Sequence, residues 1–375
     1  MSDDLLKEAQ TMDDAKEKQK YSTYIEELDL SVDKLIEGCR LPSADDFLIR
    51  EMIITALKMK LEENATLDLK IASMAQKELR YAFKVFKDYQ RFKKVTVFGS
   101  ARTGEGSPTY SLARDFARIM TDHGYMVITG AGGGIMQAAN EGAGHDRSFG
   151  LNIRLPFEQR ANRFILDDKK LIIFKYFFTR KLMFVKEADA FALFPGGFGT
   201  LDESMEILTL IQTGKSTPLP VVMLDIPGGT FWKNFVDYVK TNLMDNGYIS
   251  SHDLSYLFVT DNVESACAHI LHFYRNFHSM RVVGKYMVIR LKTRPTDEFL
   301  TRLNHDFSDI LKEDEFRIRG PFEDELTDID ITELPRLAFV FDGRSFGRLR
   351  ELIDAINDTK GEVVFPAEKR SFRFL

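Results

Sequence analysis

Cysteine is scarce in this chain, and this scarcity excludes the class of disulfide-stabilised secreted proteins. Only Cys39 and Cys267 occur in 375 residues, too few and too far apart for a disulfide framework. We expect both to be buried free thiols in a reducing compartment. No apolar run approaches the roughly 18 residues needed to cross a bilayer, and the acidic start MSDDLLKEAQ has no apolar signal segment. The sequence therefore predicts a cytoplasmic protein with no membrane association.

An excess of positive charge is also missing. The net charge of −6 argues against a surface built to bind nucleic acid, although it leaves room for a local positive pocket that holds a small anion. One basic and aromatic stretch, LRYAFKVFKDYQRFKK, has apolar residues at helical spacing: Leu79, Ala82, Phe83, Phe86 and Tyr89. We interpret it as a packed amphipathic helix with a solvated basic face, and we expect no nucleic-acid partner.

Proline and glycine are nearly absent from residues 1–93, which contain only Gly38 and Pro42. Helical periodicity over this zone predicts a helical extension. Residues 94–279 differ, because short apolar runs alternate there with helical segments. The predicted strands are KVTVFGS, YMVITG, FGLNIRL, KLIIFKY, AFALF, LPVVML and LFVT. This alternation predicts a Rossmann-like α/β domain, a parallel sheet with helices on both faces.

Helix boundary signals support this reading of the central zone. Ser107 and Pro108 form an N-cap followed by a proline at the first helical position, and Gly124 follows the end of the same helix. Residues 280–375 read as strand, helix, strand, strand, helix, which predicts a small α+β module of ferredoxin-like or similar type.

Two glycine-rich turns in the central zone each follow a predicted strand and precede a predicted helix. The first contains Gly130, Gly132, Gly133 and Gly134, and the second contains Gly196, Gly197, Gly199 and Thr200. Such turns let the backbone approach a phosphate, and the helix start supplies free N–H groups. Neither turn matches a P-loop, and the first lacks the spacing of a dinucleotide fingerprint. The two turns therefore favour a nucleotide-binding protein over a P-loop triphosphatase or a dinucleotide-dependent enzyme.

Charged residues lie close to the second turn. Arg180 and Lys181 open the preceding predicted helix, and Glu203 falls in the first predicted turn of the following one. A carboxylate can stabilise an oxocarbenium-like transition state and orient or deprotonate water, while an arginine holds phosphate or ribose oxygens. The pattern indicates cleavage of an N-glycosidic bond. The alternatives are a solvated helix start for the basic pair and a helix-dipole role for Glu203.

The segment FFTRKLMFVKEADAFALFPGGFGTLDESMEILTLIQTG, residues 177–214, resembles the Lonely Guy (LOG) family of phosphoribohydrolases. The family pattern is an Arg-Lys pair, a strand and then P-G-G-x-G-T-x-x-E. The resemblance extends through VFGSAR, ITGAGGGIMQAANEGA and GLNIRLPFEQRANRFI, over roughly residues 94–270.

The resemblance implies hydrolysis of a nucleoside 5′-monophosphate to free base and ribose 5-phosphate by a homodimer or larger homo-oligomer, without metal or cofactor. It implies that Arg180 and Glu203 are catalytic and that Lys181 contributes to substrate binding. The second glycine turn would hold the 5′-phosphate, and Ser100 and the first turn would line the nucleotide site. Some relatives carry the label lysine decarboxylase, which we reject because nothing in the sequence indicates a pyridoxal phosphate site.

The preferred base is the open part of this prediction. Plant members of the family have a glutamate where this chain has Thr179, and the flanking FKYFFTRK is more similar to the bacterial branch. This difference disfavours a cytokinin nucleotide, and the base stays open between AMP, another purine or pyrimidine, and a cytokinin-type base. Two other functions remain open: a nucleotide sensor without turnover, which the intact Arg180 and Glu203 disfavour, and a dinucleotide-dependent redox enzyme.

Three histidines, His269, His272 and His278, fall within one predicted helix. Spacing of i, i+3 could place the first two on one face as metal ligands. No acidic or cysteine residue with ligand spacing completes the set, so we expect them to have packing or surface roles and predict no metal site.

Overall fold

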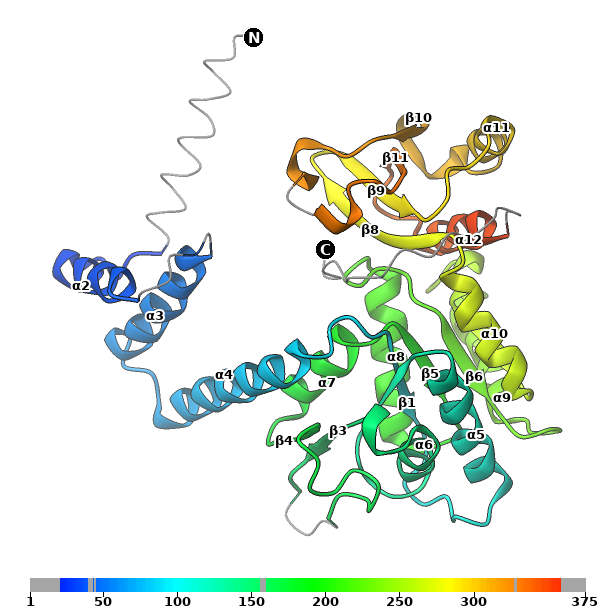
Figure 1. The fold of residues 1–375 in the computed structure, drawn as a ribbon, viewed down its shortest axis with the longest axis horizontal. Coiled ribbons are helices and arrows are strands. Elements are labelled where there is room, and N and C mark those ends of the chain that lie inside the picture. Colours follow the sequence, from blue (N-terminus) through cyan, green and yellow to red (C-terminus); the bar gives the residue numbers. More distant parts are fainter. Residues whose placement is uncertain (1–20, 40–42, 44, 156–159, 327–328, 359–375) are drawn as a thin grey trace. The chain divides into compact units, whose positions relative to one another are not determined.

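The computed structural model describes residues 21–39, 43, 45–155, 160–326 and 329–358. The chain forms two compact units, Met1–Lys77 and Glu78–Leu375. The first unit contains α2 (Glu26–Glu37), α3 (Asp46–Leu61) and the beginning of α4 (Thr66–Lys87), so the predicted extension is mainly helical where the structure describes it, and residues 1–20 of that prediction lie outside the described residues (Figure 1). Cys39 follows α2 and is exposed, which contradicts the expected burial, whereas Cys267 is buried as expected.

The second unit is built on a seven-stranded parallel sheet, and each of its strands was predicted from the sequence. The strands lie in the order β4-β3-β2-β1-β5-β6-β7. They are β1 (Lys94–Phe98), β2 (Met126–Thr129), β3 (Ser148–Ile153), β4 (Leu171–Phe174), β5 (Ala190–Leu193), β6 (Val221–Leu224) and β7 (Leu257–Thr260). The central strands β1, β2, β5 and β6 are buried at every position, as expected for parallel strands covered on both faces.

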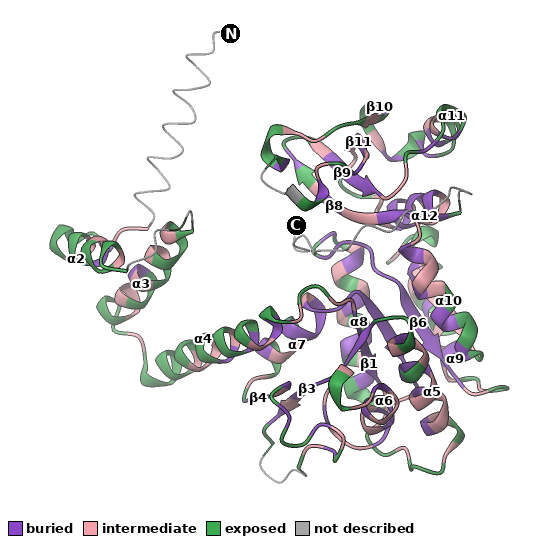
Figure 2. Cartoon of the chain, viewed as in Figure 1, coloured by how far each residue is buried: buried purple, intermediate pink, exposed green. Residues whose placement is uncertain are grey.

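Helices cover both faces of this sheet (Figure 1). One face packs against α5 (Pro108–Asp122), α6 (Ile135–Ala143) and α10 (Val263–Phe273). The other packs against α7 (Phe177–Lys186), α8 (Phe198–Gln212), α9 (Phe231–Tyr238) and the end of α4. The structure therefore confirms the Rossmann-like α/β fold, and Figure 2 shows the buried residues concentrated on the strands and on the helix sides that face them.

Local boundary signals were correct for α5. The Ser107 side chain accepts a hydrogen bond from the N–H of Tyr110, Pro108 is the first helical residue, and Gly124 has a φ of +86°. The helices α7 and α8 each begin three residues earlier than expected. Glu203 consequently lies in the second turn of α8, where the interaction of its charge with the helix dipole is weaker than in the first turn.

The C-terminal part is a small α+β module with a four-stranded antiparallel sheet in the order β10-β11-β9-β8. It comprises β8 (Phe277–Val283), β9 (Tyr286–Leu291), α11 (Asp297–Asp306), β10 (Leu311–Arg319), β11 (Arg336–Phe341) and α12 (Phe346–Asn357). Short helical turns lie at His145–Arg147, Val239–Met244, Ser251–Tyr256, Ser308–Ile310, Glu323–Glu325 and Ile329–Ile331.

Strand β8 was missed, because the sequence before it reads as a continuation of α10. The helix ends at Phe273, and the Asn357 side chain accepts hydrogen bonds from the backbone N–H groups of Asn276 and Phe277. His278 therefore lies in β8 and not in one helix with His269 and His272. His269 stacks on Phe258, in line with the expected packing role.

A fully buried ionic cluster lies within this module. Glu325 accepts hydrogen bonds from Arg290 at 2.9 Å and from Arg336 at 3.3 Å, and none of the three residues is exposed to solvent. The Arg336 guanidinium also donates to the carbonyl oxygens of Ile331, Thr332 and Leu334. The three charged groups thus pair with one another, and backbone carbonyl oxygens and the Ser279 hydroxyl accept further hydrogen bonds from the two arginines.

Candidate functional site

The candidate site lies where the strand order of the parallel sheet reverses direction. The chain runs outward from β1 through β2 and β3 to β4, and then crosses to β5 on the other side of β1. The loops that follow β1 and β5 diverge in open α/β sheets and leave a crevice for ligands. Here the two loops are joined by a hydrogen bond from the N–H of Ser100 to the carbonyl oxygen of Pro195, 3.1 Å long.

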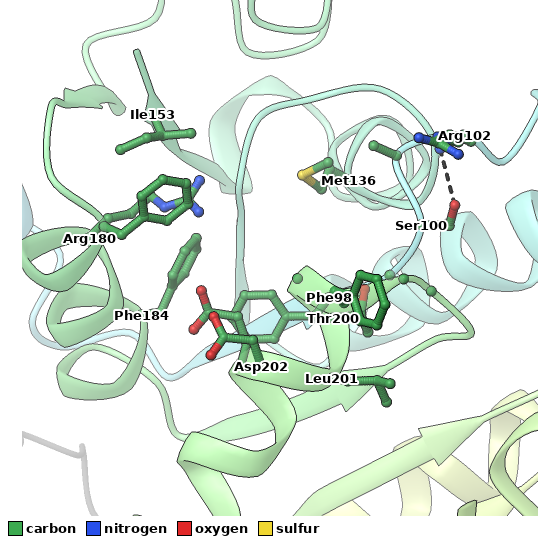
Figure 3. A pocket seen from close by; sticks show the side chains of 18 of the residues that line it. Phe98, Ser100, Arg102, Met136, Ile153, Arg180, Phe184, Thr200, Leu201 and Asp202 are labelled. Carbon is green, nitrogen blue, oxygen red and sulfur yellow. Dashed lines mark hydrogen bonds between the residues drawn. The ribbon is translucent and has the colours of Figure 1, made fainter. Parts of the chain in front are cut away.

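A cavity of about 860 Å³ opens at this position, a volume suited to a nucleotide-sized ligand (Figure 3). Its walls come from the loop after β1, the start of α6, the end of β3, α7 and the start of α8. The lining residues are Phe98, Gly99, Ser100, Ala101, Arg102, Met136, Ile153, Leu155, Phe177, Arg180, Phe184, Gly196, Gly197, Phe198, Gly199, Thr200, Leu201, Asp202 and Glu203.

The second glycine turn forms the start of α8 and lines the cavity, as expected. Gly197 is the N-cap residue, so the first N–H groups of a 15-residue helix are directed into the ligand space. A Cβ at Gly196 would collide with the Thr200 hydroxyl, whereas Gly197 and Gly199 face open space. Glycine is thus required at Gly196 by packing, while the other two leave room for a ligand.

The structure places the first glycine turn behind the loop that follows β1. Gly130, Gly132, Gly133 and Gly134 do not line the cavity, although Met136 at the start of α6 does. Gly134 has a φ of +63°, and a Cβ there would collide with the Ser100 carbonyl. The Ile135 N–H donates to that same oxygen at 3.0 Å. The first turn therefore supports the Ser100 loop from behind.

Arg180 projects from α7 into the cavity. Its guanidinium lies 5.0 Å from the ring centre of Phe177 and 5.5 Å from that of Phe184. Figure 3 shows the charged ends of Arg180 and Asp202 directed into the same space, with Ile153 above Arg180 and Met136 across the hollow. The aromatic rings hold a planar cation that can still bind an anionic ligand.

Glu203 lines the same cavity and is only 6% exposed. Burial raises the pKa of this carboxyl to about 7, and the charges of Lys181 and Arg180 oppose the rise. A carboxyl with a pKa near 7 can exchange a proton at neutral pH, which is the property of a general acid or base.

Lys181, like the first glycine turn, does not line the cavity. Its ammonium lies 2.8 Å from Asp202, 2.7 Å from Glu206 and 3.8 Å from Glu203. Although burial opposes it, hydrogen bonds to Asp202 and Glu206 raise the pKa of Lys181. The lysine is a counter-charge for three carboxylates of α8.

Several cavity residues were missed at the level of sequence. Asp202 and Arg102 are charged lining residues, and Phe198 is 94% exposed at the cavity wall. Asp202 adjoins Glu203 and Arg102 ends the VFGSAR segment, so proximity to the motifs was the available signal. Within the described ranges, no group of three His, Cys, Asp or Glu side chains is arranged to hold a metal ion, and no helix there is both long and apolar enough for a bilayer span.

The fold places this chain among the Rossmann-like α/β proteins, and comparisons with known proteins narrow the class. Residues 133–270 match the family model described as possible lysine decarboxylase. The chain is 30% identical over 174 residues to the cytokinin riboside 5′-monophosphate phosphoribohydrolase of Mycobacterium tuberculosis, covering 43% of this chain and 86% of that protein. It is 29% identical over 168 residues to cytokinin riboside 5′-monophosphate phosphoribohydrolase LOG2 of Arabidopsis thaliana, covering 43% and 74%.

The chain belongs to the LOG family of phosphoribohydrolases, which are hydrolases of N-glycosidic bonds. A solved structure of a molybdenum cofactor binding protein from Rippkaea orientalis is also similar, with 17% identity, a TM-score of 0.33, and coverage of 48% of this chain and 95% of that one. A similarity this distant does not identify a ligand.

Proposed function

We propose that this protein hydrolyses the N-glycosidic bond of a nucleoside 5′-monophosphate and releases the free base and ribose 5-phosphate. The observation that carries the proposal is the buried Glu203, with a pKa near 7, beside Arg180 in a nucleotide-sized cavity that ends at a glycine-rich helix start. Its relatives named as cytokinin riboside 5′-monophosphate phosphoribohydrolases support the substrate class.

In this mechanism the 5′-phosphate accepts hydrogen bonds from the N–H groups at the start of α8, near Gly197 and Gly199. Arg180 binds phosphate or ribose oxygens. Ionised Glu203 stabilises positive charge on the ribose ring and takes a proton from water as the water oxygen bonds to C1′. The bond from C1′ to the base breaks, and the base leaves with the electron pair and gains a proton. No step of this scheme uses a metal or a cofactor.

The first test is incubation of the purified protein with AMP, GMP, IMP, CMP, UMP and a cytokinin riboside 5′-monophosphate, with free base followed by chromatography. We expect one base to be released together with an equal amount of ribose 5-phosphate. We also expect Glu203→Gln to lower kcat by about 10²–10⁴-fold with substrate binding largely retained, and Arg180→Ala to impair both.

Nucleotide binding without release of any base would favour the alternative function, a nucleotide sensor. A wild-type rate in Glu203→Gln would refute the proposed role of Glu203. Release of base from the cytokinin nucleotide alone would overturn the expectation that a cytokinin nucleotide is disfavoured.

We further propose that a second copy of the chain covers the apolar surface beside the cavity, which we define as Phe178, Leu182 and Met205. These side chains are 54%, 37% and 40% exposed. Phe178 and Leu182 lie one turn apart on α7, and Met205 lies on α8, which is ion-paired to α7 through Lys181. Exposed apolar side chains on two neighbouring helices are suited to the interface of a homo-oligomer.

A further inference from the structure

The start of α7 is held by a carboxylate from a distant part of the chain. Tyr176, the N-cap residue of α7, makes no capping hydrogen bond with its side chain. Glu78 of α4 lies beside it and is 7% exposed. The N–H of Lys175 donates to Glu78 Oε1 at 2.6 Å, and the Thr179 hydroxyl donates to Glu78 Oε2 at 2.6 Å. The two hydrogen bonds thus lie on either side of the residue from which the helix begins.

Both oxygens of Glu78 are used, and the contact with Thr179 is buried. Thr179 is 1% exposed, and its hydroxyl also lies 3.0 Å from the Tyr176 carbonyl oxygen. A negative charge at a helix N-terminus is favourable, and charge-assisted hydrogen bonds are the stronger kind. Glu78 therefore fixes both the origin and the rotation of the first turn of α7.

The next residue after Thr179 is Arg180, whose guanidinium reaches the cavity. A change in the rotation of α7 would change the direction in which this side chain leaves the helix. Small displacements of a catalytic group reduce turnover strongly, even when the substrate still binds.

Glu78 is itself held firmly by its own helix. One turn and two turns later on α4, Ala82 and Phe86 are buried in the main core. Phe86 stacks on Phe149 of β3 with ring centres 4.4 Å apart. The carboxylate thus occupies the buried stripe of α4, at a position that packing determines.

From these contacts we infer that Glu78 is a positioning residue for Arg180, so that α4 forms part of the active site. This inference rests on the proposed function, because Arg180 is the group that Glu78 positions. Glu78 lies outside the cavity and acts only through the backbone of Lys175 and the side chain of Thr179.

The test compares Glu78→Gln, Thr179→Val and Thr179→Ser in the full-length protein. We expect the first two to lower kcat about tenfold or more with KM changed less than kcat, because the phosphate-binding start of α8 is untouched. Thr179→Ser keeps the hydroxyl and should retain the wild-type kcat. Glu141→Gln is the matched control, since Glu141 accepts a 2.7 Å hydrogen bond from Tyr110 away from the cavity.

The inference is overturned if Glu78→Gln lowers the melting temperature as Glu141→Gln does but leaves kcat intact. Equal losses of kcat in Thr179→Val and Thr179→Ser would also overturn it. Hydrogen exchange of the amides from Lys175 to Lys181 gives a readout that needs no turnover. We expect faster exchange in Glu78→Gln than in wild type or Glu141→Gln, and unchanged exchange would refute the inference. If wild type releases no base, the proposed function fails, and the exchange result still decides whether Glu78 holds α7.

Discussion

Glu203 and Lys181 show how single residues of this site are tuned by their surroundings. Burial favours the neutral form of the Glu203 carboxyl and raises its pKa to about 7, while the adjacent lysine favours the ionised form. The sequence predicted a catalytic role for Glu203, because its motif follows a glycine turn, and the structure places this residue in the cavity wall, while the catalytic role stays a prediction. The sequence could not show that Lys181 is ion-paired with Asp202 and Glu206, because that depends on how α7 packs beside α8.

The pH dependence of the reaction follows from this tuning. If ionised Glu203 is the base, kcat/KM should rise with pH, with the midpoint of the rise near pH 7, and level off at higher pH. Lys181→Met removes a charge that lowers the Glu203 pKa, so the midpoint of the rise should move to higher pH. Initial rates measured between pH 5 and pH 9 test this. An unchanged midpoint in Lys181→Met would contradict the assigned role of the lysine.

Stability gives an independent check on the same group. The pKa of Glu203 in the folded protein lies above its unfolded value near 4.5, so the folded state binds more protons between these two values. The free energy of unfolding of wild type relative to Glu203→Gln should therefore fall, by about 1–3 kcal/mol, as the pH rises from 4.5 through 7. Urea unfolding of both proteins at several pH values measures this difference.

Glu78 illustrates what the sequence could and could not reveal about a residue. The helical stripe of α4 was recognised from Ala82 and Phe86, and Glu78 lies on the same stripe at i, i+4 and i+8. A charge on an apolar stripe was the available signal. Its partners lie 97 and 101 residues further along the chain, and no local pattern identifies them.

At the scale of elements, the parallel strands were predictable because each is a short apolar run bounded by helices. Strand β8 was not, because the aromatic residues after α10 continue a helical pattern that a long-range contact with Asn357 interrupts. The two glycine turns were also predicted, but the difference between their positions relative to the cavity was not. One faces the cavity and the other supports the loop behind it, a distinction set by the packing of Gly134 against Ser100.

This difference between the two glycine turns can be tested by measuring the free energy of unfolding of two variants. Gly134→Ala combines a positive φ with a collision at the Ser100 carbonyl, so it should lower the free energy of unfolding by at least about 2 kcal/mol. Gly197→Ala meets no atom within 4 Å and should change it by less than about 1 kcal/mol. Denaturant unfolding of the two variants measures both values. Equal destabilisation would mean that the first turn is not the structural one.

At the scale of the whole molecule, the proposed homo-oligomer makes a direct prediction. Wild type should sediment as a dimer or larger species at micromolar concentration, and Phe178→Glu with Leu182→Glu should sediment as a monomer, because burying carboxylates in an apolar interface is costly. Tyr248→Glu is the control, since Tyr248 is exposed but lies outside the defined apolar surface. A monomeric wild type would refute the proposal.

The C-terminal module packs against the parallel-sheet domain through buried contacts that the sequence did not predict. Arg350 of α12 is fully buried, donates to the Leu219 carbonyl oxygen and contacts His269 of α10. Removing residues 281–375 would therefore uncover part of the catalytic unit. The zone boundaries at residues 93 and 279 remain predictions, while the helical, parallel and antiparallel parts themselves are all present.

The buried cluster of Glu325, Arg290 and Arg336 has a consequence for how this sequence can change over evolutionary time. Loss of Glu325 would remove the carboxylate that two buried guanidinium groups share, and loss of either arginine would remove donors from the carboxylate oxygens. Each single step is strongly destabilising, whereas replacing all three with apolar residues of similar volume is nearly neutral. Descendants of this chain should therefore keep the three positions together or exchange them together, so that they covary as a unit.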